Sequence, residues 1–416
     1  MGSRRPPQET KWGARNRPKG SKILAEVETF MNLLIHDLNE KEWEKISADY
    51  EGWKVISPDE NIHPCMGCFG CWTKTPGECV IKDGFDHMSE LIHNAGEVVI
   101  ISKYTYGGFS SFVKNVLDRS LGYLLPYFRI VKGEMHHKPR YPEKKPVTFI
   151  FHGNNLSDDE KKAAEKYVTA VCVNLNGILK EIRFEDFELD NKQEPLKETR
   201  TINTIYETVA FNCSTRGNNS NSGRFLNVVE GSLNGEVTRV NLASYINKPD
   251  EAIEFLLSAQ KIILAMPLYV DGISSAMLKL MVDAEKECAG NKEQMKNKKV
   301  YVIANMGFYE SKQLSNLNYM VKSWCLKCGF EYCGAVLIGA GVMMGQVLPL
   351  KNAGPGKFVY EDLIKMADAI NASENLPDIY TRVNKFPRIA YYFAGNSGFV
   401  KTAKSNGLTK KDTLKR

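Results

Sequence analysis

Residues Lys261–Cys288 read KIILAMPLYVDGISSAMLKLMVDAEKEC. An apolar, β-branched run comes first, then a turn with Pro and Gly, then apolar residues at helical spacing. The segment therefore predicts a strand, a loop and a helix in that order. Similar units recur along the chain, and strands that alternate with helices predict a parallel sheet with both faces covered.

The alternation occurs in two series. We expect the first at Ser21–Ile35 (helix), Trp53–Ile56 (strand), Phe85–Asn94 (helix), Glu97–Ile101 (strand), Phe109–Leu121 (helix), Pro146–Phe151 (strand), Asp158–Leu175 (helix) and Ile178–Phe184 (strand). We expect the second at Ile205–Phe211, Val237–Leu242, Lys261–Ala265, Lys299–Ala304 and Ala335–Ile338 (strands), with helices at Ser222–Asn234, Pro249–Ala259, Ser274–Cys288, Gln313–Cys328 and Lys357–Asn371. Ile101–Ser120 resembles Ala265–Ala284, which indicates a weak internal duplication.

The composition is that of an ordinary globular protein. The chain has 416 residues, 43% hydrophobic and 25% charged, which excludes a disordered, collagen-like or coiled-coil chain. It has neither an apolar run of about 18 residues nor a secretory signal, so we expect a soluble, cytoplasmic protein without a membrane span.

The charge lies at the two ends. Residues 1–22 carry seven Lys or Arg against one Glu, and residues 379–416 carry nine against one Asp. These ends are either solvated basic tails or surfaces for an anionic ligand or an acidic partner. No nucleic-acid-binding signature accompanies them, so we expect no nucleic acid partner.

The segment Asn212–Ser222, NCSTRGNNSNS, follows a predicted strand and opens a helix. Its Ser, Asn and Gly residues can turn backbone N–H groups and hydroxyls inward, and Arg216 adds a positive charge beside the helix N-terminus. This suits a phosphate monoester. The loop is neither a Walker loop nor a dinucleotide fingerprint, and a polar turn with a good helix cap is the alternative.

With these motifs the chain resembles a known family. The Asn212–Ser222 loop, the PLYVDGISS segment and the alternating pattern are similar to those of flavodoxin-fold, NAD(P)H-dependent FMN reductases. The resemblance covers nearly the whole chain, once per series. It implies an α/β fold of two flavodoxin-like doubly wound parallel sheets in tandem, with FMN as cofactor and NAD(P)H as co-substrate.

In that family three loops at the carboxyl ends of strands hold the flavin. We name their counterparts in the second series the phosphate loop (Asn212–Ser222), the ring loop (Pro267–Gly272) and the closing loop (Asn305–Phe308). The resemblance implies these FMN-binding residues: Ser214, Arg216, Ser220, Asn221 and Ser222; Pro267, Leu268, Tyr269 and Gly272; and Asn305, Met306, Gly307 and Phe308.

The first series departs from the family pattern. Its basic stretch Gly2–Ser21 stands where the phosphate loop is expected, and no strand precedes it. In a flavodoxin-like sheet that first strand is central, so we expect the first sheet to lack it and the natural start to lie upstream. Lys103 also stands where the family usually has Pro. FMN binding is therefore expected in the second series.

Four of the ten cysteines form a dense cluster, which we name the Cys loop (Cys65–Cys79). Cys65, Cys68 and Cys71 are each three residues apart and Cys79 follows, so they wrap a loop around one centre, as thiolates do around a 4Fe–4S cluster. The spacing also resembles that of iron–sulfur flavoproteins. A thiol loop without metal and a zinc site stay open as alternatives.

Together these features predict an FMN-dependent oxidoreductase that passes electrons from NAD(P)H to a small-molecule or protein acceptor, with the iron–sulfur cluster as an intermediate carrier if the Cys loop holds one. No catalytic acid or base is assigned, because all seven His precede residue 153 and hydride transfer to a flavin depends mainly on positioning. The alternatives are a non-catalytic FMN and iron–sulfur electron carrier, and a Cys-metal module on a degenerate scaffold.

The two series are expected to cooperate. We place one domain with the Cys loop at 1–190, a linker at 191–203, an FMN-binding domain at 204–372 and a basic, aromatic tail that packs on them at 373–416. Since each half has what the other lacks, we expect the Cys loop to face the FMN of the second half across an intrachain pseudo-twofold interface. Two independent modules are the alternative, and a homo-oligomer beyond this pair stays open.

Overall fold

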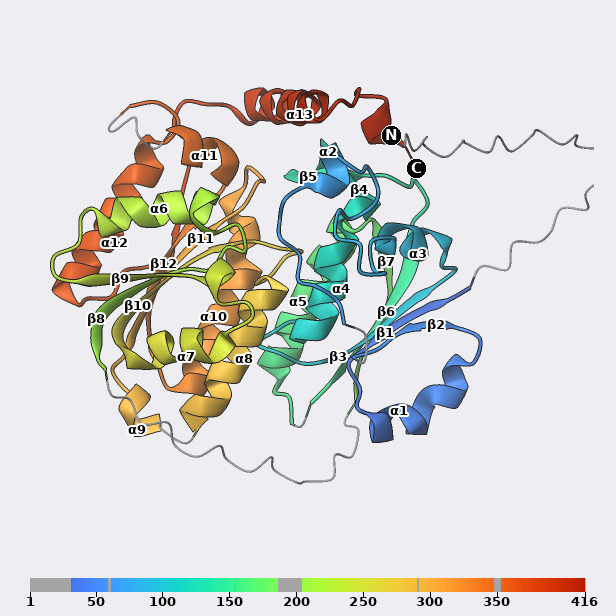
Figure 1. The fold of residues 1–416 in the computed structure, drawn as a ribbon, viewed down its shortest axis with the longest axis horizontal. Coiled ribbons are helices and arrows are strands. Elements are labelled where there is room, and N and C mark those ends of the chain that lie inside the picture. Colours follow the sequence, from blue (N-terminus) through green and yellow to red (C-terminus); the bar gives the residue numbers. More distant parts are fainter. Residues whose placement is uncertain are drawn as a thin grey trace, which may run out of the picture. The chain divides into compact units, whose positions relative to one another are not determined.

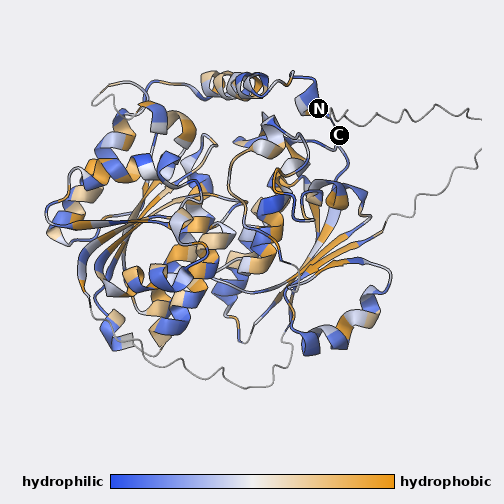
Figure 2. Cartoon of the chain, viewed as in Figure 1, coloured by the Kyte–Doolittle hydropathy of each residue, from blue (hydrophilic) through white to orange (hydrophobic). Residues whose placement is uncertain are grey.

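The computed structural model describes residues 31–58, 61–153, 155–185, 204–289, 292–347 and 353–415. They form two parallel sheets that follow each other along the chain, with helices packed on their faces (Figure 1). The strands are largely hydrophobic (Figure 2), as expected of parallel strands that are covered on both sides.

The first sheet has the order β2-β1-β3-β6-β7, and all its pairs are parallel. Its strands are β1 (Leu33–His36), β2 (Lys54–Ile56), β3 (Val98–Lys103), β6 (Lys145–His152) and β7 (Gly177–Glu185). The second sheet has the order β9-β8-β10-β11-β12-β13. Its strands are β8 (Tyr206–Asn212), β9 (Val237–Asn241), β10 (Ala259–Pro267), β11 (Lys299–Asn305), β12 (Glu331–Ile338) and β13 (Ile379–Tyr380).

Each sheet places its first strand between its second and third. This is the flavodoxin-like order 2-1-3-4-5, to which the second sheet adds β13 at its edge. The predicted α/β fold with two flavodoxin-like sheets in tandem is therefore confirmed. Because β13 lies beyond residue 372, the second sheet continues past the position at which we ended its domain.

The central strand β1 corrects one expectation, since the first sheet does not lack its first strand. Leu33, Leu34 and Ile35 are buried between β2 and β3. Periodicity cannot distinguish so short an apolar run from part of a helix. We therefore assigned Leu33–Ile35 to the end of a helix expected over Ser21–Ile35. The rest of that helix and the Gly2–Ser21 stretch lie outside the described residues. The reason for expecting a start further upstream falls away.

The helices of the first half are α1 (Glu40–Ile46), α2 (Gly70–Thr73), α3 (Met88–Asn94), α4 (Ser111–Arg119) and α5 (Asp158–Asn174). Those of the second half are α6 (Asn221–Glu230), α7 (Pro249–Ser258), α8 (Ser275–Ala289), α9 (Lys292–Met295), α10 (Ser315–Cys328), α11 (Gly341–Val347) and α12 (Lys357–Ala372). Eight helices lie where we expected them, namely α3 to α8, α10 and α12, whereas α1, α2, α9 and α11 were not predicted. Among the described residues, none of the helices is long and apolar enough to cross a membrane.

The two halves share one apolar core. α4 packs against α8 and α5 contacts α10, and Val116 of α4 and Val168 of α5 belong to the same buried cluster as Met277 of α8 and Met320 of α10. The alternative of two independent modules is therefore wrong. The predicted linker, 191–203, lies outside the described residues.

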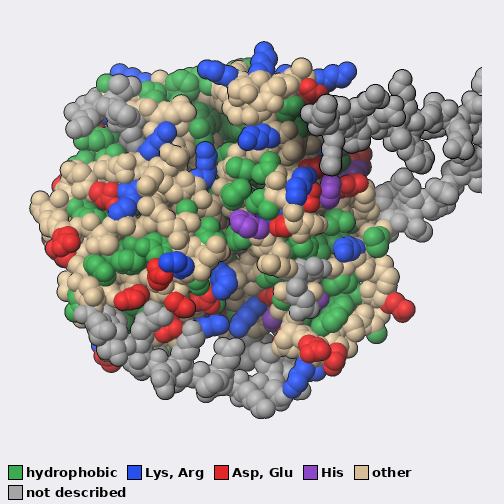
Figure 3. Space-filling model, in the orientation of Figure 1, with side chains coloured by type: hydrophobic (Ala, Val, Ile, Leu, Met, Phe, Trp, Pro, Cys, Tyr) green, Lys and Arg blue, Asp and Glu red, His purple; other side chains and the backbone are tan. Residues whose placement is uncertain are grey.

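Two further elements connect the halves, and the sequence analysis predicted neither in detail. A hairpin of β4 (Leu124–Val131) and β5 (Glu134–Pro139) extends from the first half. Helix α13 (Arg388–Ser405) lies over β4 and α2 (Figure 1), so part of the predicted tail packs on the first half. Lys and Arg side chains gather along the edge of the molecule that carries α13 (Figure 3).

Candidate functional site

The three predicted flavin loops meet at the carboxyl edge of the second sheet. They follow β8, β10 and β11, which are neighbours in the sheet. The N–H of Leu268 donates to the carbonyl of Asn305 at 2.8 Å, and the Asn305 side chain donates to the Ser222 hydroxyl at 2.7 Å. The structure therefore brings the residues that we predicted from three distant segments into one place.

The phosphate loop is built around the start of α6. Ser220 caps the helix by accepting from the N–H of Gly223 at 3.0 Å, and Ser214 accepts from the N–H of Arg216 at 3.3 Å. Ser214, Ser220 and Ser222 are buried, whereas Arg216 is exposed. The hydroxyls, the N-terminus of a ten-residue helix and one exposed cation at this end fit a phosphate group.

The ring loop is a tight turn in an uncommon conformation. Tyr269 and Gly272 exchange two backbone hydrogen bonds of 3.0 and 2.9 Å. Val270 and Asp271 between them have φ values of 36° and 61°, in the left-handed region that residues with a side chain rarely adopt. The two residues therefore carry backbone strain that their surroundings must hold.

The closing loop is covered by the β4–β5 hairpin and by α13. The rings of His136 and His137 lie 5.6 and 5.1 Å from that of Phe308, and the hydroxyl of Tyr391 donates to the carbonyl of Gly307 at 2.5 Å. Burial lowers the pKa of His137 to about 3, so its imidazole is neutral near pH 7. Aromatic side chains of the hairpin and of α13 therefore pack on this side of the site.

The FMN group fits the second half and does not fit the first. Flavodoxin-like folds bind FMN where the strand order reverses, and in the second half that is the edge of β8 and β10. In the first half the same position holds Asp37, which accepts from the Lys103 N–H at 2.9 Å and contacts His152 at 2.7 Å. Helix α1 begins with Glu40 and Glu42, so this end repels an anion.

The Cys loop turns backbone N–H groups toward its sulfurs. The N–H groups of Gly67, Gly70 and Ile81 each donate to the sulfur two residues earlier, at 3.4, 3.4 and 3.5 Å, to Cys65, Cys68 and Cys79 respectively. Left-handed backbone at Gly67 and Phe69 allows these turns. Such bonds favour the thiolate form of cysteine, which is the form that binds metals.

All four predicted metal ligands line one pocket. Its other lining residues include Met66, Ile81, Asp118, Arg119 and Leu121. Burial, together with the nearby Asp118 carboxylate, raises the pKa of Cys65 to about 12. Without a cation this thiol stays protonated, whereas bound metal favours the thiolate.

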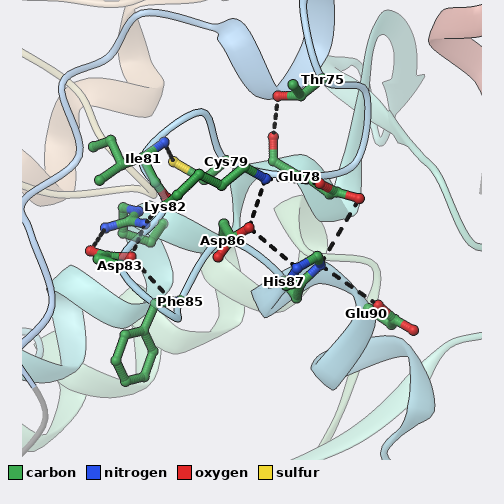
Figure 4. Close-up of polar contacts among 11 residues, drawn as sticks. Thr75, Glu78, Cys79, Ile81, Lys82, Asp83, Phe85, Asp86, His87 and Glu90 are labelled. Atoms are coloured by element: carbon green, nitrogen blue, oxygen red, sulfur yellow. Dashed lines mark hydrogen bonds and ion pairs between the residues drawn. The ribbon is translucent and has the colours of Figure 1, made fainter. Parts of the chain in front are cut away.

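The segment after Cys79 is anchored by charged side chains. Asp83 accepts from both terminal nitrogens of Arg119, each at 2.8 Å, and this guanidinium holds the pKa of Asp83 well below its usual range. Lys82 contacts Glu78 at 3.0 Å and Asp86 at 2.7 Å (Figure 4). These pairs fix the direction in which the chain leaves the pocket.

The sulfurs of the Cys loop are not gathered as closely as the ligands of one metal ion. Among the described residues, Glu78, Asp86 and His87 bring three ligand atoms within 4.8 Å of one another, and no three of the four sulfurs do so. Thiolates on one tetrahedral zinc stand about 3.8 Å apart, since Zn–S bonds are about 2.3 Å. A single zinc ion would therefore need at least three of these thiols to move closer together.

The Cys loop touches the ring loop and the phosphate loop directly. A Cβ atom on Gly67 would lie 1.9 Å from the hydroxyl oxygen of Tyr269, and the hydroxyl of Thr215 donates to the carbonyl of Cys65 at 3.2 Å. The Cys loop thus lies beside the ring loop of the other half, as expected, whereas its contact with the phosphate loop was not predicted. Its expected place beside Met306–Phe308 stays a prediction. The closing loop is contacted by the β4–β5 hairpin, through His136 and His137 on Phe308.

Sequence reasoning missed several residues that build the site. Thr215 and Asp271 lie in predicted loops but were not singled out, and Asn174 and His136 come from elements without a motif. The hairpin carried one signal, Lys132-Gly133 between two strand-like runs, which is a turn in left-handed conformation at both residues.

Comparisons with known proteins cover part of the chain. No protein-family model matches it. An iron–sulfur flavoprotein of Archaeoglobus fulgidus is 31% identical over 77 residues, which are 18% of this chain and 34% of the relative. An iron–sulfur flavoprotein of Methanocaldococcus jannaschii is 29% identical over 104 residues, 25% of this chain and 47% of the relative. The chain thus spans a third to a half of the curated relatives it matches.

Solved structures match at low similarity. The Trp repressor binding protein of Bacillus subtilis is 20% identical and is covered in full by 41% of this chain, with a TM-score of 0.30. An FMN-dependent NADH-azoreductase of Bacillus anthracis is 12% identical, with 40% of this chain covering all of it and a TM-score of 0.29. Neither likeness identifies the chain.

Proposed function

We propose that the chain is a flavin-dependent oxidoreductase that binds FMN at the three loops of the second sheet and a 4Fe–4S cluster in the Cys loop. The observation that carries the proposal is the direct contact between the two sites, through Gly67 with Tyr269 and Cys65 with Thr215. The partial match to two iron–sulfur flavoproteins supports it. When bound, FMN supplies exchange between hydride and single-electron transfer.

The residues of the chain would bind and orient the cofactors. At the start of α6, Arg216 would offset negative charge of the FMN phosphate and the hydroxyls of the phosphate loop would donate hydrogen bonds to it. The ring loop and the closing loop would border the flavin ring, and the hairpin packs on Phe308 of the closing loop. The side chain of Tyr269 in the ring loop lies against Gly67 of the Cys loop, so it sets the separation of the two loops. We propose NAD(P)H as the electron donor on the resemblance of the PLYVDGISS segment.

A second candidate function is an electron carrier without a small-molecule substrate. The packing of His136, His137 and Tyr391 on the closing loop favours it, because these side chains occupy one approach to the site. Reduction of the purified protein by NADH and NADPH, measured in the steady state, distinguishes the two. Turnover with either nucleotide supports the enzyme, and reduction only by a protein donor supports the carrier.

The FMN assignment is tested by Arg216→Ala combined with Ser222→Ala. Loss of both partners of a dianionic phosphate should weaken FMN binding by about a hundredfold. Arg382→Ala combined with Ser232→Ala removes the same residue types away from the loop and should leave FMN bound. Full flavin content in the first double variant would overturn the assignment.

The cluster is tested by metal analysis of protein purified without oxygen. We expect four irons per chain in the wild type, and in Cys68→Ala a loss of iron with retention of FMN. Cys333→Ala, which removes a buried thiol elsewhere, should keep both. Absence of iron in the anaerobic wild type would refute the cluster, and one zinc per chain would replace it.

A further inference from the structure

Two side chains of α5, in the first half, hold the ring loop of the second. Asn174 donates through Nδ2 to both carboxylate oxygens of Asp271, at 2.7 and 2.8 Å. Tyr167 donates its hydroxyl to the carbonyl of Val270 at 3.0 Å. Both residues of the strained turn are therefore fixed from outside their own domain.

Asn174 also contacts the hairpin that covers the closing loop. Its Oδ1 accepts from Nδ1 of His136 at 2.7 Å, and the His136 ring packs on Phe308. Asn174, His136 and Asp271 are 8, 4 and 4% exposed. The buried amide of Asn174 thus bonds both to the ring loop and to the β4–β5 hairpin, which covers the closing loop.

The ring loop depends on such a partner for two reasons. Left-handed backbone at two successive residues with side chains persists only where the surrounding contacts enforce it. In addition, the carboxylate of Asp271 is buried, and a buried carboxylate needs hydrogen-bond donors to remain ionised. Asn174 satisfies both needs with the same group.

We propose that Asn174 is a positioning residue of the flavin site, which sets the ring loop through Asp271 and aligns it with the closing loop through His136. This inference rests on the proposed function, because it assigns Asn174 to the FMN site. It predicts that FMN affinity in the second half depends on an amide supplied by the first half.

The direct test is Asn174→Leu, which removes both polar atoms at similar size. FMN should bind about ten to a hundred times more weakly to the apo chain, since hydrogen bonds to a charged group are lost. Amide exchange at Gly272, whose N–H closes the turn on Tyr269, should become faster in the same variant. This second readout needs no cofactor.

Asn318→Leu is the matched control. Asn318 is also a buried amide: it donates to a carboxylate, Asp378, at 2.9 Å and accepts from a side-chain donor, the hydroxyl of Tyr332, at 2.8 Å. It lies on α10, outside the flavin loops. We expect a comparable loss of stability, with FMN affinity and Gly272 exchange unchanged.

A charge swap tests the contact itself. Asn174→Asp alone places two carboxylates face to face and should weaken FMN binding at least tenfold. Asn174→Asp combined with Asp271→Asn restores an amide donating to a carboxylate and still accepts from His136, so FMN affinity should return to within about threefold of the wild type. The swap keeps the proposal testable if Asn174→Leu does not fold.

The outcomes separate the two proposals. A wild type that binds no FMN would overturn the proposed function and this inference with it. FMN binding that is normal in Asn174→Leu, or no better in the swap than in Asn174→Asp, would overturn the role of Asn174 alone.

Discussion

A Cβ atom on Gly67 would lie 1.9 Å from the hydroxyl oxygen of Tyr269. The Cys loop of the first half and the ring loop of the second therefore meet at a point where only glycine fits. Gly67 also has a φ of 62°, so its backbone as well as its lack of a side chain suits this position.

Gly67→Ala should separate the two loops. We expect it to reduce the free energy of unfolding by about 2 kcal/mol more than Gly84→Ala, because the added methyl has no space. Gly84 is the control: it also has a left-handed φ, 87°, and a Cβ there would meet nothing within 4 Å. Chemical unfolding of both variants measures the difference, and equal losses would refute the contact.

The buried pair of Lys114 and Asp118 gives a second prediction. Both side chains are fully buried, and Asp118 also accepts from the N–H of Ser275 at 2.9 Å. Lys114→Met leaves this carboxylate without its cation and should cost about 3–5 kcal/mol. Adding Asp118→Asn removes the charge while keeping an acceptor for Ser275, so most of the loss should be recovered.

The control for that pair lies on α8, in the other half. Lys279 and Asp283 form an exposed pair with the same spacing, at 2.8 Å. Lys279→Met should change the free energy of unfolding by about 0.5 kcal/mol or less, because water screens the pair. If Lys279→Met lowered the free energy of unfolding as much as Lys114→Met does, burial could not be the cause of the loss in Lys114→Met.

Asp271 predicts a pH dependence of stability. Burial raises its pKa to about 6, against the opposing effect of the Asn174 hydrogen bonds. Between about pH 4 and 6 the folded state binds the proton more tightly than the unfolded chain, so this group lowers stability as the pH rises.

Asp271→Asn abolishes that titration. The free energy of unfolding of the variant minus that of the wild type should increase by about 2–3 kcal/mol from pH 4 to pH 7. Urea unfolding at both pH values measures it, and a constant difference would refute the raised pKa. The other titratable groups that face Asp271 are the same in both proteins: Lys114 on α4, Glu134 and His136 on β5, and Tyr167 and Cys172 on α5.

The last prediction concerns how α13 is seated. A Cβ on Gly395 would lie 2.4 Å from the ring of Phe128, whereas one on Gly398 would meet nothing within 4 Å. Gly395→Ala should therefore lift the helix and make it sensitive to protease. Gly398→Ala, on the same helix, should instead stabilise it by about 0.5–1 kcal/mol. Equal protease resistance of the two variants would contradict the close packing.

The fold could be predicted where local pattern and packing agree. Strands such as β10 contain long apolar runs and were found, whereas β1 was missed because three successive apolar residues carry too little periodicity. The three flavin loops could be placed because parallel strands end at one edge. The contact between Asn174 and Asp271, which are 97 residues apart in the sequence, could not be predicted. It depends on how helices of the two halves pack against each other.

The position of α13 bears on how the chain matures. Phe399 on this helix packs on Phe69 and Trp72 of the Cys loop, and Asn406 just after it donates to the carbonyl of Thr73 at 3.0 Å. During synthesis the Cys loop leaves the ribosome more than three hundred residues before these partners. Metal delivered during translation would therefore reach thiols that are still uncovered, and the closing of α13 over the loop would be a late step of assembly.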